Sequence, residues 1–107
     1  MISTNVEVRH LRAFAATAEQ LHFTRAAAGL HITQQALSTQ IRFLEKQLGI
    51  KLFDRTTRKV ELTIAGVVLY RHLQGLFDQL DRAVDEARRS ASVEGRPSEP
   101  QCLVKTR

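Results

Sequence analysis

The sequence is poor in the residues that build disulfide or metal frameworks. Cysteine occurs once in 107 residues, at Cys102, which excludes an internal disulfide and a zinc cluster made of cysteines. We interpret Cys102 as an incidental thiol in a polar tail. The four histidines include no pair at the i, i+4 spacing of a metal site on a helix. We therefore expect no metal and no cofactor.

Long apolar runs are also missing. No stretch approaches the ~20 apolar residues that are needed to span a bilayer. The segment 1–10 is polar and of mixed character, unlike a secretory signal. We expect a cytoplasmic protein with no membrane partner.

Positive charge is concentrated in the first two-thirds of the chain. The formal net charge is +5, and up to Thr63 nine Lys and Arg residues stand against five acidic ones. Between residues 64 and 92 the balance is four against four. Such an excess favours an anionic partner. A membrane-surface helix would gather its cations on one amphipathic segment, and no segment does so.

Hydrophobic periodicity predicts three helices in this basic region, over residues 8–20, 25–29 and 34–48. Thr24 and Thr33 are the expected N-caps of the second and third helices. Two helices joined by a turn of about four residues form a helix-turn-helix unit.

The predicted helix 34–48 has two different faces. Its apolar face carries Leu37, Ile41, Leu44 and Leu48. The side chains expected to hydrogen-bond DNA base edges in the major groove are Gln34, Gln35, Ser38 and Thr39. Arg42 and Lys46, further along, are expected at flanking phosphates. A polar stripe is more often a solvated face, but its place in a helix-turn-helix unit favours DNA.

Two short β-compatible runs follow, Lys51–Arg55 and Val60–Leu62, and they predict a hairpin, or wing, with a basic tip. The wing cations expected at phosphates or in the minor groove are Arg55, Arg58 and Lys59. Thr24 and Arg25 open the preceding helix, whose free N–H groups also suit a phosphate. The alternative is that these residues only cap a helix or keep the surface soluble.

Thr63 is expected to cap a long helix that runs to about Ser90. We predict that its apolar stripe forms a homodimer interface, made by Leu69, Leu73, Leu76, Phe77, Leu80 and Val84. Part of this stripe should cover the chain's own winged domain, and the distal part could instead fold back or fray. The predicted organisation is a DNA-binding domain over 1–63, a linker and dimerisation helix over 64–92, and a disordered tail or linker stump over 93–107.

An enzyme is not expected. Asp81 and Asp85, one helical turn apart, are the carboxylate pair that invites speculation about acid–base chemistry. They flank Arg82 on the polar side of the long helix, so ion pairing or solvation explains them better. The predicted fold class is all-α with a small β-hairpin wing.

The chain resembles the N-terminal DNA-binding domain of LysR-type transcriptional regulators. The matching segments are Phe23-Thr24-Arg25-Ala26-Ala27, Leu30-His31-Ile32-Thr33-Gln34, Ala36-Leu37-Ser38, Gln40-Ile41-Arg42, Leu44-Glu45, Leu48-Gly49, Leu52-Phe53, Arg55, Leu62-Thr63 and Ala65-Gly66. The resemblance covers roughly Val8 to Ser90. It implies a bacterial regulator that binds double-stranded DNA at an interrupted inverted repeat, with the long helix pairing two copies.

The chain departs from the family pattern at two of the residues expected to contact base edges, and also in its length. Thr39 and Gln35 stand where the family often has Arg and Pro, which bears on the operator sequence. No effector-binding domain follows Ser92, so we expect a fragment or a short natural form without the inducer response. A second hypothesis follows, in which the chain pairs with a full-length regulator and modulates it. A contact with RNA polymerase is left open.

Overall fold

The computed structural model describes residues 5–56 and 59–94, and these residues form four helices and one hairpin. The elements are α1 (Val8–Gln20), α2 (Phe23–Leu30), α3 (Gln34–Leu48), β1 (Phe53–Asp54), β2 (Glu61–Leu62) and α4 (Ile64–Glu94). The strands pair antiparallel, with Phe53 opposite Leu62. The predicted winged helix-turn-helix followed by a long helix is confirmed, although each strand is only two residues long.

Local signals explain where most helices begin and end. Thr33 accepts the backbone N–H of Ala36 and caps α3, and Gly49 ends this helix with a φ of 73°. The predicted start of α2 is wrong. His22 is the N-cap, because its Nδ1 accepts the Arg25 N–H at 3.2 Å, and Thr24 lies inside the first turn. The helix also continues past Gly29 and ends before His31, which is left-handed.

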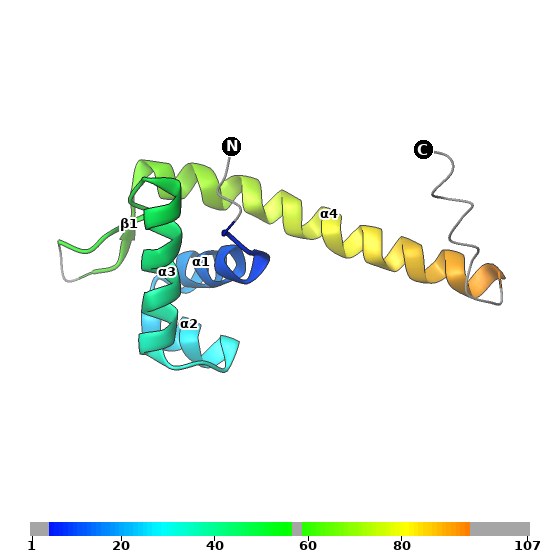
Figure 1. Cartoon of the computed structure of the whole chain (residues 1–107), viewed down its shortest axis with the longest axis horizontal. Helices are drawn as coiled ribbons and strands as arrows, with labels where there is room; N and C mark the ends of the chain where they lie inside the picture. Colours follow the sequence, from blue (N-terminus) through cyan, green and yellow to red (C-terminus); the bar gives the residue numbers. More distant parts are fainter. Residues whose placement is uncertain (1–4, 57–58, 95–107) are drawn as a thin grey trace. The chain divides into compact units, whose positions relative to one another are not determined.

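The core joins α1, α2, α3 and the wing. Its largest fully buried side chains are Phe14, Phe53, Leu37, Ile41, Leu44 and Leu52. The rings of Phe14 and Phe53 lie 5.5 Å apart, so β1 is packed directly on α1. The three helices contact one another (Figure 1), and α3 turns its predicted apolar face inward. Because the apolar face packs inward, the polar face of α3 points to solvent.

The chain divides into two compact units, residues 1–74 and 75–107. The first unit includes the start of α4, where Thr63 caps the helix by accepting the Gly66 N–H at 3.0 Å. Leu73 is buried in the chain. In the second unit, the helix continues to Glu94 and exposes large apolar side chains, namely Leu76, Leu80 and Val84. The first two residues of the predicted tail 93–107 belong to α4, and the rest of that tail lies outside the described residues. Within the described ranges, no helix has the length and apolar character to cross a bilayer.

Candidate nucleic-acid interface

The polar face of α3 is presented to solvent at the start of the helix. Gln34, Gln35 and Thr39 are exposed and Ser38 is half-buried. Because Leu37 and Ile41 are fully buried, the helix cannot rotate without losing the core. The four predicted base readers are therefore held as one surface by the packing beneath them.

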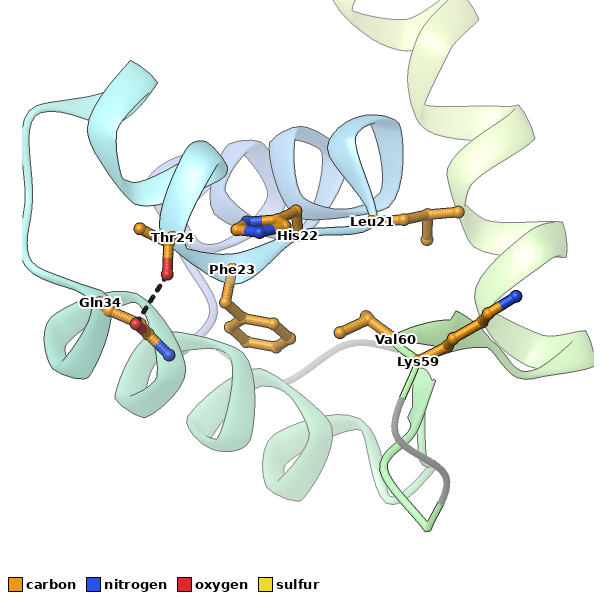
Figure 2. A pocket seen from close by; sticks show the side chains of 7 residues that line it. All are labelled: Leu21, His22, Phe23, Thr24, Gln34, Lys59 and Val60. Carbon is orange, nitrogen blue, oxygen red and sulfur yellow. Dashed lines mark hydrogen bonds between the residues drawn. The ribbon is translucent and has the colours of Figure 1, made fainter.

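Gln34 and Ser38 of this surface form one wall of a groove whose other wall is the wing, and Gln35 and Thr39 do not line its two hollows. A hollow of about 520 Å³ is lined by Leu21, His22, Phe23, Thr24, Gln34, Lys59 and Val60 (Figure 2). An adjoining hollow of about 210 Å³ shares Phe23 and Gln34 and adds Ser38, Arg42 and Arg55. The fold thus brings together predicted readers of α3 and predicted phosphate ligands of the wing.

A buried carboxylate attaches the wing to α3. Glu45 is 5% exposed and accepts the N–H groups of Leu52 at 2.8 Å and Phe53 at 3.2 Å. It also accepts a 3.0 Å bond from Nη1 of Arg55. Burial by itself raises the pKa of Glu45, but the bonds from Leu52, Arg55 and Phe53 outweigh it and hold the pKa below its ordinary value.

Arg55 is therefore more than a surface cation. Its side chain is 28% exposed, and its guanidinium carbon lies 5.6 Å from the centre of the Phe23 ring. Nη2 of Arg55 is buried and has no hydrogen-bond partner in the part of the chain that the structure describes. A buried donor of this kind calls for an acceptor. Arg55 lines the groove, so an anionic oxygen entering there could supply one.

Asp54 places a negative charge on the same groove. Its carboxylate accepts the hydroxyl of Thr56 at 2.6 Å and the Thr56 N–H at 3.0 Å. These two hydrogen bonds lower the pKa of Asp54, so the group stays ionised near neutral pH. It shapes the start of the wing turn.

The other predicted phosphate ligands are spread around this groove. Arg25 is exposed in the first turn of α2, and Lys59 is exposed on the wing. Arg42, which also lines the hollow of about 210 Å³, lines a further hollow of about 330 Å³ with Lys46 and Lys51 at the end of α3. Arg58 lies outside the described residues.

The predicted dimer stripe is divided between core and surface. Leu73 is 4% exposed, so it is a core residue of its own chain and has little surface left for a second chain. Leu69 and Phe77 are half-buried. Leu76 is 51%, Leu80 42% and Val84 41% exposed. The distal residues remain available for assembly.

Two functional contacts were not predicted from the sequence. Glu45 lies one residue from Leu44 and four from Ile41, and this place on the buried face is the signal that could have assigned it to the core. The second contact is a 2.9 Å hydrogen bond from the Thr24 hydroxyl to Oε1 of Gln34. No sequence pattern signals it, because it depends on how α2 packs on α3. Across 5–56 and 59–94, no group of three or more His, Cys, Asp or Glu side chains could hold a metal ion.

Comparison with known proteins identifies the family of this chain. The sequence model of the bacterial regulatory helix-turn-helix proteins of the lysR family matches residues 8–67. The chain belongs to the LysR family. The match covers all three core helices, the wing and the start of α4.

Two members of this family are similar to this chain over most of its length. The HTH-type transcriptional regulator YnfL of Escherichia coli is 48% identical over 85 residues, which are 79% of this chain and 29% of YnfL. AlsR of Bacillus subtilis, another HTH-type transcriptional regulator, is 44% identical over 89 residues, 83% of this chain and 30% of AlsR. The chain thus spans under a third of these two LysR-family relatives. Both are named as transcriptional regulators rather than enzymes.

A solved LysR-family structure shows the same fold on DNA. The DNA-binding domain of BenM from Acinetobacter baylyi, in complex with catB site 1 DNA, is 42% identical to this chain. The two superpose with a TM-score of 0.79, over 81% of this chain and 97% of the BenM chain.

Proposed function

We propose that this chain is the DNA-binding part of a transcriptional regulator, which recognises a specific double-stranded sequence in the bacterial cytoplasm and catalyses no reaction. The observation that carries the proposal is the shared groove. Gln34 and Ser38 of α3 line the same hollow as Arg55 and Lys59 of the wing, so base contacts and backbone contacts can form together. Relatives named as transcriptional regulators and the BenM–DNA complex support this assignment.

In this proposal α3 enters the major groove, which is about 12 Å wide and admits one helix. Gln34, Gln35, Ser38 and Thr39 contact base edges, since they lie in the first turns of the outward face. The unpartnered Nη2 of Arg55 donates to a backbone oxygen, because Glu45 and Phe23 already hold the guanidinium in place. The remaining phosphate ligands are Thr24 through its backbone N–H, Arg25, Arg42, Lys46, Arg58 and Lys59.

The chain works as a homodimer on an inverted repeat in this proposal. Two copies related by a twofold axis present two α3 helices to two half-sites. The exposed Leu76, Leu80 and Val84 support the pairing, because burying each would contribute roughly 1.5–3 kcal/mol.

Selection from a library of random DNA duplexes tests the function. The wild-type chain should enrich a motif with two inverted half-sites. Ser38→Ala should then cost ~1–3 kcal/mol on the enriched duplex and far less on a scrambled one. Gln20→Ala, an exposed change at the end of α1, is the matched control and should bind as the wild type does. If no motif is enriched, the proposed function is wrong.

A further inference from the structure

A hydrogen bond joins the beginnings of the two helices of the helix-turn-helix unit. Thr24 is the second residue of α2 and Gln34 is the first residue of α3. The Thr24 hydroxyl donates to Oε1 of Gln34 at 2.9 Å, and both residues line the groove between α3 and the wing (Figure 2). The side chain of a predicted base reader is thus held from outside its own helix.

The bond decides which end of the Gln34 carboxamide is turned away from α2. A carboxamide carries an acceptor oxygen and a donor nitrogen. Oε1 receives the Thr24 proton, and Nε2 lies on the side away from Thr24 (Figure 2). The beginning of α2 carries partial positive charge, which also favours the oxygen rather than the nitrogen at this place. The group that remains for a ligand is an N–H donor.

We propose that Thr24 is a positioning residue that makes Gln34 a hydrogen-bond donor toward the base edge. The inference rests on the proposed function and specifies which bases Gln34 selects. In the major groove, guanine offers the acceptors O6 and N7, thymine offers O4 and adenine offers N7, whereas cytosine offers only the N4 donor. Gln34 therefore favours guanine or thymine over cytosine. It does not make the paired contact of glutamine with adenine, which needs the oxygen to accept from N6.

Removing the hydroxyl tests this role. A neutral hydrogen bond of this kind biases a side chain roughly two- to tenfold in water. Thr24→Val keeps the shape and removes the bond, whereas Thr24→Ser keeps the hydroxyl. Thr24→Val should therefore lower the preference for guanine or thymine over cytosine by about two- to tenfold. Thr24→Ser should preserve it.

The experiment uses a random duplex library with the wild type, Thr24→Val, Thr24→Ser, Gln34→Ala and the double variant. Positions that lose base preference in Gln34→Ala identify the bases that Gln34 reads. At these positions Thr24→Val should also lose preference, and the double variant should match Gln34→Ala, because the two residues act through one contact. Circular dichroism melting confirms that each variant is folded.

A second measurement needs no DNA. In Thr24→Val, the three-bond couplings of the Gln34 side chain should take values averaged over several rotamers. In Thr24→Ser they should remain those of the wild type.

Two outcomes would overturn the positioning role while leaving the proposed function intact. One is an enriched motif whose base preferences are the same in Thr24→Val and the wild type. Another is an equal loss of affinity on all duplexes, which would make the Thr24 hydroxyl a phosphate contact. A wild type that enriches no motif would instead refute the proposed function, and this inference with it.

Discussion

Arg55 donates a 3.0 Å hydrogen bond to Oε1 of Glu45, and the other oxygen of this carboxylate accepts the Leu52 N–H at 2.8 Å. One buried group therefore holds both the first strand of the wing and the wing arginine to α3. The contact explains how a hairpin with strands of only two residues keeps a defined position, since isolated hairpins are marginal in water. The geometry of the groove depends on it.

The first prediction concerns the stability of this attachment. Glu45→Gln should lower the free energy of unfolding by about 1–3 kcal/mol, because a charged acceptor of three bonds is replaced by a neutral one. Since the pKa of folded Glu45 lies below its ordinary 4.5, the carboxylate stabilises the fold fully above that value. The stabilisation is lost as the pH falls through the lower, folded pKa. The difference in the free energy of unfolding between the wild type and Glu45→Gln should therefore become smaller below pH 4.5, as measured by urea titration.

Glu19→Gln is the control for this measurement, since Glu19 is an exposed carboxylate on α1. It should change the free energy of unfolding by a few tenths of a kcal/mol at most. A gap between the wild type and Glu45→Gln that stays constant at all pH values would contradict the assignment.

The sequence predicts the helices and the outward face of α3 well, because both follow from periodicity. Leu37, Ile41 and Leu44 recur at helical spacing, so the direction of Ser38 follows from theirs. Contacts between elements were not predictable in this way. Glu45 is a charged residue in the core, where it accepts hydrogen bonds from three donors. The N-cap of α2 is His22 rather than the predicted Thr24. These contacts depend on how separate segments pack against one another in the fold, and the periodicity of the sequence does not predict that packing.

A second prediction concerns the packing of α4 on the turn before the wing. A Cβ at Gly66 would overlap the carbonyl oxygen of Leu52 and approach Leu62. Gly66→Ala should therefore destabilise the fold by roughly 1–3 kcal/mol. Gly75→Ala is the matched control, because no atom lies within 4 Å of its added Cβ. It should stabilise the helix by about 0.5–1 kcal/mol. Chemical denaturation of the two variants measures both effects, and equal signs would contradict the close contact.

A third prediction separates backbone contacts from base reading. Lys59→Ala and Lys46→Ala should each weaken binding to all duplexes by a similar factor, because phosphates carry no sequence information. Each variant should reduce the slope of log affinity against log salt by about 0.9. Arg89→Ala removes an exposed charge of α4 in the second unit and serves as control. Fluorescence anisotropy at several salt concentrations gives the slopes. An unchanged slope for Lys59→Ala would place the wing away from the DNA backbone.

The last prediction concerns assembly through the distal part of α4. Leu76, Leu80 and Val84 recur at steps of four residues, so they lie along one side of the helix, and all three are more than 40% exposed. Side chains of this size in such a row are typical of an interface. Leu73 is excluded from it, because its surface is already buried in its own chain.

Leu80→Asp should therefore convert the dimer to a monomer and leave the winged domain folded, since the change lies in the second unit. Loss of the second half-site contact should remove most of the affinity for a two-half-site duplex and little of that for a single half-site. Gln79→Asp adds the same charge at the neighbouring exposed position and should remain a dimer. Sedimentation velocity gives the oligomeric state of all three proteins. A monomeric wild type would exclude the homodimer, and a dimeric Leu80→Asp variant would mean that another surface pairs the chains.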